Sequence, residues 1–414
     1  MKKSHLFLAL IALIALTTFL AGCATQPSGG VTPTPTTVIT TQAPVPGAIY
    51  SQAAVDFKLG MRKLWTDHAV WTRMYIIESL DNSDAAGPAA ERLLLNQEDI
   101  GNAIKPVYGD AAGDQLTALL KEHILIAVDI IDAVKAKNAT AQAAAEARWT
   151  ANADEIATFL ASANPNWPKA TLQNLLSMHL STTKDELVAR YTKNYPADVA
   201  AWDAVYNHIL VMADALSDGI LKQYPGKFAG PAVYTQSQMD LRNNMRKLWT
   251  DHTVWTRLYI IESLNDSPAA SNAAGRLLQN QVDIGNAIKP LYGDAAGNQL
   301  TELLRQHILI AVDIIDAVKA KNATAQAEAE TAWTTNADQI ATFLAGANPN
   351  WPVQTLKDLL HMHLSTTKDE LVARYTKNYP ADVTAYDTVY DHILTMSDAL
   401  TDGIMAQFPA KFTT

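Results

Sequence analysis

Residues 61–73 read MRKLWTDHAVWTR, and the stretch returns 184 positions later, at residues 245–257, as MRKLWTDHTVWTR. Three further stretches repeat at the same offset: IGNAIKP at 100 and 284, HILIAVDIIDAVKAKNATAQA at 123 and 307, and HLSTTKDELVARYTKNYPADV at 179 and 363. Because the offset never changes, nothing is inserted between the copies. We interpret this as a tandem duplication of a whole domain, with one copy over residues 51–229 and the other over residues 235–414.

Within each copy, apolar residues recur at the spacing of an α-helix, and no segment shows the alternation of a half-buried strand. Pro88 suits a first helical turn, Pro106 is expected to end the helix before it, and Gly109 allows a turn. Thr140 is expected to cap the next helix. The pattern predicts an all-α fold, two tandem up-and-down bundles of five to six helices each. In the first copy these cover residues 53–80, 88–104, 110–137, 140–163, 169–193 and 196–223.

The N-terminal residues predict where in the cell the protein is located. Lys2 and Lys3 precede an apolar run over residues 6–20, which is typical of an export signal. The run is followed by Leu-Ala-Gly-Cys23, which resembles the lipobox of prokaryotic lipoproteins, in which the cysteine is acylated. We therefore expect a signal peptide over residues 1–22 and a lipid on Cys23. A Thr/Pro-rich tether over residues 23–50 would hold the domains on the outer face of the cell membrane.

Charge and cysteine content exclude other classes. The net charge of -10 argues against nucleic-acid binding, which needs clustered Lys and Arg. Cys23 is the single cysteine, so no disulfide forms within the chain. The expected partners are the membrane, through the lipid, and either a metal ion or another protein.

Histidines are the main candidates for chemistry. Each copy has one on each of four predicted helices, all with apolar neighbours at helical spacing, and alternating helices would bring them to one level of the bundle. Imidazoles at one level could bind Zn, Cu, Fe or Ni, with Asp99 or Glu186 as a carboxylate ligand. The resulting candidate metal ligands are His68, His123, His179, His208 and Asp99 in the first copy, and His252, His307, His363, His392 and Asp283 in the second.

A competing interpretation is a buried polar network, in which each histidine bonds to a tyrosine, an aspartate or a backbone carbonyl. Tyr75, Tyr206 and Asp67 are within reach of such a network. The spacing of di-iron bundles, Glu-x-x-His, is missing, and the second copy alone adds His361. Acid-base chemistry in a pocket remains a third alternative.

No catalytic signature stands out. Asp67 and His68 are adjacent and diverge around a helix, so they cannot easily bond to each other. Glu186 and Arg190, four residues apart, are expected to pair on a helix face. Trp167 is expected to plug one end of the bundle. Three Asn-x-Ser/Thr sites fit either N-glycosylation or, as we favour, helix capping: Asn138, Asn265 and Asn322.

The motifs LWTDHAVWTR, NQEDIGNAIKPVYG and NPNW resemble a family of all-helical proteins from bacteria and archaea with no assigned activity. The resemblance covers nearly all of each copy and implies a helical fold, without implying any catalytic residue. Two functions remain open. One is a surface binding protein with a metal ion in each core, and the other is a structural or interaction module with two equivalent docking faces.

Overall fold

The computed structural model describes residues 46–414, which belong to one compact unit, Pro44–Thr414. The predicted signal peptide, Cys23 and nearly all of the predicted tether lie outside the described residues. Within residues 46–414 there are eleven α-helices and two very short strands, which confirms the all-α prediction. None of these helices has the length and hydropathy of a membrane span.

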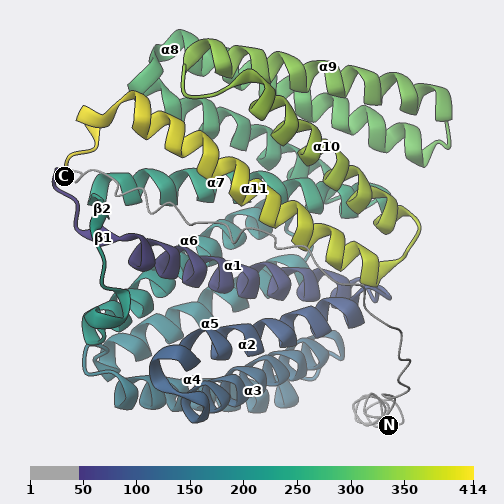
Figure 1. The fold of residues 1–414 in the computed structure, drawn as a ribbon. Helices are drawn as coiled ribbons and strands as arrows, with labels where there is room; N and C mark the ends of the chain where they lie inside the picture. Colours follow the sequence, from purple (N-terminus) through teal and green to yellow (C-terminus); the bar gives the residue numbers. More distant parts are fainter. Residues whose placement is uncertain (1–45) are drawn as a thin grey trace, which may run out of the picture. The chain divides into compact units, whose positions relative to one another are not determined.

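The N-terminal bundle is a ring of six helices (Figure 1). Each helix packs against the next, and the last returns to pack against the first. Because α1 contacts α2, α3, α5 and α6, it is the helix around which the bundle is built. The six are α1 (Gln52–Leu80), α2 (Ala86–Tyr108), α3 (Asp110–Lys135), α4 (Ala139–Ala163), α5 (Lys169–Tyr191) and α6 (Tyr195–Gln223).

The C-terminal bundle has the same order of packing in five helices, because α8 corresponds to α2 and α3 together. Gly293 interrupts α8 with φ 84°, a backbone conformation that favours glycine, and Gly109 separates α2 from α3 with φ 85°. The helices are α7 (Gln236–Leu264), α8 (Ala270–Lys319), α9 (Ala323–Ala347), α10 (Val353–Tyr375) and α11 (Tyr379–Gln407). The remaining elements are β1 (Tyr50–Ser51) and β2 (Ala232–Tyr234), which pair antiparallel, and the 3-10 turns η1 (Pro225–Phe228) and η2 (Pro409–Lys411).

Two predicted helix ends are wrong. Pro106 does not stop α2, which continues to Tyr108, because near a helix end the missing proline N–H removes a single hydrogen bond. The cap of α4 is Asn138 rather than Thr140: the Asn138 side chain accepts from the Ala141 N–H at 3.1 Å. Asn322 caps α9 in the same way, as the capping interpretation expects, and Asn265 lies at the C-cap of α7.

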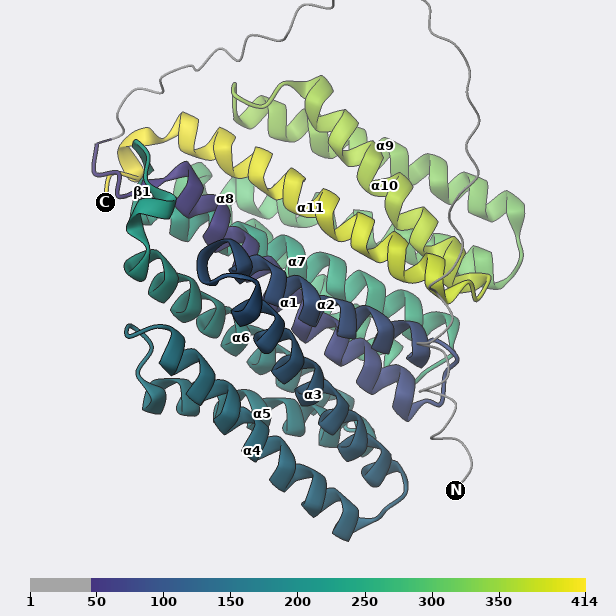
Figure 2. The ribbon, with the colours of Figure 1, turned by 60° about the horizontal axis from the view of Figure 1, so that its bottom comes forward.

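The central helices of the two bundles, α1 and α7, lie side by side (Figure 2). In α1 every residue from Trp65 to Trp71 is buried, and in α7 every residue from Trp249 to Trp255 is buried. Each of these helices is surrounded by its own bundle and also contacts the central helix of the other bundle. These helices therefore belong to two cores at once, their own and the contact between the bundles.

Reciprocal ion pairs join the bundles. Arg190 pairs with Glu262 at 2.7 Å, and Arg374 pairs with Glu78 at 2.6 Å, all four side chains being buried. Arg92 binds Asp387 at 2.6 Å, and Arg276 binds Asp203 at 3.0 Å. In each case the two contacts are related by the offset of 184 residues. The contact is thus isologous, with the same surface used by both bundles.

The predicted pair between Glu186 and Arg190 is wrong. Glu186 instead accepts from Arg73 at 2.5 Å, while Arg190 reaches Glu262 in the other bundle and Asp81. Burial explains the difference, because both side chains point into contacts between helices, whereas the prediction places them on a solvated helix face.

Candidate functional site

Three histidines of each bundle converge in its core. In the N-terminal bundle they come from α1, α3 and α5: the His68 and His179 rings lie 5.4 Å apart, and the His123 and His179 rings 5.9 Å apart. All three are 2–3% exposed. The C-terminal bundle repeats the arrangement with the rings of His252, His307 and His363, at 5.4 and 6.1 Å. We call each group of three a histidine cluster.

Side-chain amides fix the orientation of two rings in the N-terminal cluster. The Asn152 amide nitrogen donates to the Leu119 carbonyl, so its oxygen faces His123 Nδ1 at 2.9 Å. The Gln97 nitrogen donates to the Leu93 carbonyl, and its oxygen lies 3.3 Å from His68 Nδ1. Both imidazoles must therefore carry their proton on Nδ1, which leaves a lone pair on Nε2. His123 Nε2 is buried without any hydrogen-bond partner among the described residues.

The C-terminal cluster shows how closely the ring nitrogens approach. His252 Nε2 and His363 Nε2 are 3.4 Å apart. Two nitrogens bound to one tetrahedral ion at about 2.0–2.1 Å would be separated by roughly this distance. Asn336 orients His307 as Asn152 orients His123, with the oxygen 2.8 Å from Nδ1. Gln281 donates to His252 Nδ1 through its nitrogen, at 3.3 Å, so the His252 proton lies on Nε2, the opposite tautomer to that of His68.

Burial keeps the clusters uncharged. It lowers the pKa of His68 to about 3 and that of His123 to about 4, in each case because the charged ring would lose its hydration. The pKa of His179 is also lowered well below its usual value, by burial and then by the neighbouring histidines. The pKa values of His252, His307 and His363 are lowered in the same way. At neutral pH these buried imidazoles are therefore uncharged, and each keeps a lone pair on one ring nitrogen.

Not every predicted ligand joins a cluster. His208 Nε2 lies 2.8 Å from the Leu175 carbonyl, and His392 Nε2 lies 2.8 Å from the Leu359 carbonyl, so each is already bonded within its bundle. Asp99 and Asp283 lie near the surface, where they pair with Arg92 and Arg276 at 3.7 Å. Glu186 is held by Arg73 in the contact between the bundles. The structure thus brings together three of the four histidines and none of these carboxylates.

The sequence interpretation misses the amides that orient the rings. It expects a tyrosine, an aspartate or a backbone carbonyl as the partner, and backbone carbonyls do hold His208 and His392. Asp67, however, pairs with Lys63 at 3.0 Å, and Gln97 and Asn152 hold the clustered histidines. A signal is present, because these amides lie on faces that are otherwise apolar, Gln97 between Leu93 and Ile100 and Asn152 beside Ala153 and Ile156. A buried amide requires a partner as much as a buried histidine does.

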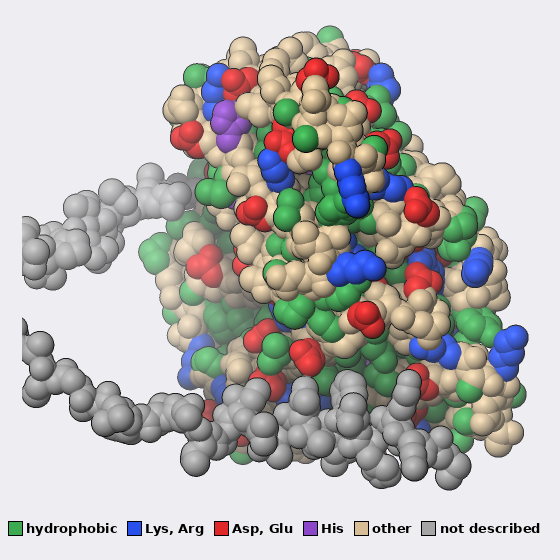
Figure 3. Space-filling view, turned by 90° about the vertical axis from the view of Figure 1, so that its right-hand side faces the viewer, with side chains coloured by type: hydrophobic (Ala, Val, Ile, Leu, Met, Phe, Trp, Pro, Cys, Tyr) green, Lys and Arg blue, Asp and Glu red, His purple; other side chains and the backbone are tan. Residues whose placement is uncertain are grey.

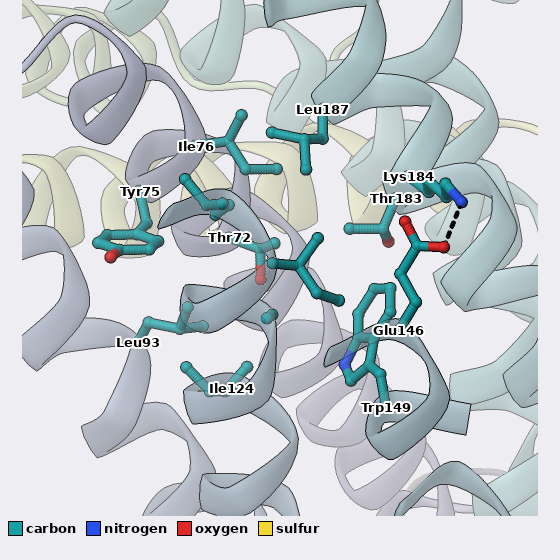
Figure 4. A pocket seen from close by; sticks show the side chains of 13 residues that line it. Thr72, Tyr75, Ile76, Leu93, Ile124, Glu146, Trp149, Thr183, Lys184 and Leu187 are labelled. Atoms are coloured by element: carbon teal, nitrogen blue, oxygen red, sulfur yellow. Dashed lines mark hydrogen bonds and ion pairs between the residues drawn. The ribbon is translucent and has the colours of Figure 1, made fainter. Parts of the chain in front are cut away.

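Within residues 46–414, no group of three or more His, Cys, Asp or Glu side chains already has the arrangement of a metal site. The His123 ring is nearly stacked on His179, with 24° between their planes, so its Nε2 is not directed at a point shared with the other two. A mainly apolar cavity of about 30 Å³ lies near the cluster (Figure 4). It is lined by Trp149, which contacts the His123 ring at 5.1 Å, and by the Glu146–Lys184 ion pair.

The surface offers no comparable concentration of one residue type on the face that Figure 3 shows. Acidic, basic and hydrophobic side chains are interspersed there, and neither sign of charge gathers into a patch. This pattern is typical of a solvated surface.

Comparisons with known proteins identify no relative: no family model matches the chain, and no curated protein or solved structure matches it significantly. The resemblance of the repeated motifs to a family of helical proteins stays a prediction.

Proposed function

We propose that this protein is an exported, lipid-anchored metal-binding protein, with one divalent transition-metal ion in the histidine cluster of each bundle. The main observation in support of this proposal is that three buried, neutral imidazoles approach one another in each core. Imidazole nitrogen suits Zn, Cu, Fe and Ni, and these metals are the ligand class that we propose.

The amides around the clusters support a ligand role. Histidines that bind metals usually donate their second ring N–H to an oxygen, which fixes the tautomer and raises the basicity of the ligating nitrogen. Asn152 and Asn336 supply such an oxygen to His123 and His307. To complete a three-nitrogen site, the His123 ring would have to turn from its stacked orientation so that Nε2 points at the position between His68 and His179.

The anchor is proposed from the sequence. The apolar run over residues 6–20 is followed closely by Cys23, the single cysteine of the chain. Labelling cells with a radioactive fatty acid should mark the protein, and Cys23→Ser should abolish the label and release the chain from the membrane fraction. A Cys23→Ser protein that stays labelled would contradict the anchor without affecting the metal site.

The metal site is tested by elemental analysis of untagged protein comprising residues 44–414, which form one compact unit. We expect about one metal ion per bundle. His123→Ala/His307→Ala should remove it, whereas the matched control His208→Ala/His392→Ala should retain it, because those histidines bond to backbone carbonyls outside the clusters. Circular dichroism establishes that each variant keeps its helices.

Acidity provides an independent readout. A metal held by exposed histidines is lost as pH falls below about 6.5. Because burial lowers the pKa of His123 and His307 to about 4, protons should not compete until the pH approaches that value. We expect metal to remain bound at pH 5 as long as the fold persists.

The alternative function is a structural or interaction module whose clusters are buried polar networks. The bonded state of His208 and His392 favours this interpretation for those two residues. Absence of metal from the purified protein, even after Zn, Cu and Fe have each been supplied during refolding, would reject the metal proposal and leave this alternative.

A further inference from the structure

A cleft of about 430 Å³ opens between α4 and α5 of the N-terminal bundle. Its volume is within the range of small-ligand sites. The rim carries Glu146, Asp154 and Lys184, and exposed Gln173 and Ser177 line its α5 side. The apolar cavities inside the bundles are far smaller, at about 20–30 Å³ each.

The floor of this cleft is the wall of the histidine cluster. Trp149 lines the cleft and also contacts the His123 ring at 5.1 Å. Leu176, another floor residue, lies on α5 three residues before His179 and is therefore adjacent to it on the helix surface. One layer of side chains thus separates solvent in the cleft from the cluster.

The corresponding region of the C-terminal bundle differs at two of these lining positions, where Lys357 replaces Gln173 and His361 replaces Ser177. His361 Nε2 reaches across to Asp338 at 3.0 Å, and Lys357 binds the same carboxylate at 3.1 Å. Both side chains therefore bridge α10 to α9.

The bridge made by His361 has no counterpart at the small Ser177 of the N-terminal bundle, although Asp154 also has two partners on α5, Gln173 and Lys169. Leu364 is accordingly buried, at 8% exposure, whereas its counterpart Leu180 is partly exposed. The C-terminal groove thus has a side chain across it at the position where the N-terminal cleft has Ser177.

The net charge of the lining residues also differs between the two bundles. Glu146, Asp154 and Lys184 give the N-terminal cleft a net charge of about -1 at neutral pH, and Lys357 makes the corresponding C-terminal set neutral. A negative cleft raises the local concentration of cations and speeds their entry. Lys169 cancels this difference in net charge, because it reaches Asp154 at 3.3 Å from outside the lining and its counterpart is a valine. The bridge therefore contributes more to the contrast than charge does.

The tryptophan between cleft and cluster is also held differently. Trp333 Nε1 donates to the His307 carbonyl at 3.1 Å, which fixes its indole. Trp149 Nε1 is buried without a hydrogen-bond partner in the part of the chain that the structure describes. Turning Trp149 aside therefore breaks no hydrogen bond, whereas turning Trp333 breaks one.

We propose that the α4–α5 cleft is the entry route for the metal ion to the N-terminal cluster, and that His361, Lys357 and the bonded Trp333 obstruct the equivalent route. The two clusters then load at different rates although their ligands are the same. This inference rests on the proposed metal-binding function.

The test compares single-cluster proteins. His307→Ala/His363→Ala leaves the N-terminal cluster, and His123→Ala/His179→Ala leaves the C-terminal one. Uptake of Zn²⁺ from a coloured indicator is followed by stopped flow. The N-terminal cluster should load at least about tenfold faster.

The decisive variants exchange the cleft residues. Gln173→Lys/Ser177→His should slow loading of the N-terminal cluster about tenfold, and Lys357→Gln/His361→Ser should accelerate the C-terminal one by a similar factor. Equilibrium affinity should change little, because no ligand is altered. These positions lie on the helix surface, so circular dichroism should be unchanged.

The outcomes separate the two proposals. Equal loading rates that do not respond to the exchanges, with Zn²⁺ bound normally, would overturn the entry route and leave the metal site standing. Failure of both single-cluster proteins and of the unaltered protein to bind Zn²⁺ would overturn the proposed function and the entry route with it.

Discussion

The two bundles have the same residues around the apolar cavities at their ends, whereas two of the residues that line the cleft between α4 and α5 differ from their counterparts. Small apolar cavities of about 30 and 20 Å³ lie at equivalent places, and each residue lining the first has the same residue type 184 positions later. Between α4 and α5, by contrast, the N-terminal bundle has Ser177 where the C-terminal bundle has His361, which adds a bridge to Asp338.

Surface side chains can therefore make two equal cores unequal in access. Identical buried side chains reproduce the cluster geometry, including the amide contacts of Asn152 and Asn336. Access is decided by residues that contribute little to folding, because exposed ion pairs are worth at most about 1 kcal/mol.

The largest effect is expected from substitutions at the contact between the bundles, which test whether the two halves of that contact contribute equally to stability. Arg73 binds Glu186 and Asp198 while lying 5.4 Å from the Trp255 ring of the other bundle. Arg257 binds Glu370 and Asp382 and lies 5.3 Å from the Trp71 ring. Arg73→Ala and Arg257→Ala should each lower the free energy of unfolding by about 3–5 kcal/mol, because each change removes the cation that binds two buried carboxylates, of which Asp382 keeps only its contact with Arg374 at 3.5 Å.

Urea unfolding measures both losses. The control is Arg148→Ala, whose pair with Asp129 is more than half exposed on both sides and should matter by no more than about 1 kcal/mol. Losses for Arg73→Ala and Arg257→Ala that differ by several kcal/mol would show that the isologous contact is not energetically symmetric.

A smaller effect is expected at the bundle ends, where Trp167 fills the space as the sequence predicts, being 6% exposed. A Cβ added at Gly219 would lie 1.9 Å from Trp167 Nε1, and one at Gly403 would lie 1.9 Å from Trp351 Nε1. Gly219→Ala and Gly403→Ala should each destabilise the protein by about 1–3 kcal/mol, since overpacking outweighs the better helix propensity of alanine.

Thermal unfolding of both variants checks this prediction. Gly60→Ala is the matched control, because it lies in α1 with nothing within 4 Å of the added Cβ and should stabilise by up to about 1 kcal/mol. A neutral Gly219→Ala beside a destabilising Gly403→Ala would mean that the two ends are packed differently.

The smallest effect concerns a contact that one bundle lacks. Lys63 lies 3.2 Å from Asp391, whereas the position equivalent to Asp391 is Asn207, so Lys247 has no such partner there. Asn207→Asp should stabilise by about 0.2–1 kcal/mol, because the new pair is solvated. Repeating the urea titration at high salt should remove the gain, and a gain that persists in salt would need another cause.

Much of the architecture can be predicted from the sequence. Helical spacing and a constant offset indicate two all-helical bundles, and the apolar neighbours of His68, His123 and His179 indicate that they point inward, as the structure confirms. The same rule predicts that His208 points inward, as its burial confirms. Helical spacing gives the direction of a side chain around the axis but does not identify its partner on the next helix, which for His208 is a backbone carbonyl.

Most local features follow from the sequence alone: which segments are helices, that Gly109 allows a turn between two of them, and which face of each is apolar, although the end of α2 and the cap of α4 do not. Pairings between distant residues required the tertiary structure. Glu186 binds Arg73 rather than Arg190, and Arg190 binds Glu262 of the other bundle, because the partner of a buried charge depends on which helices meet. Helical rise predicts that Asp99 lies at the same level of the bundle as the histidines. The structure places it at the surface, beside Arg92, because the packing of the helices decides which side chains meet. Rise per residue sets the height of a side chain in a bundle, whereas packing around α1 and α7 sets which side chains meet there.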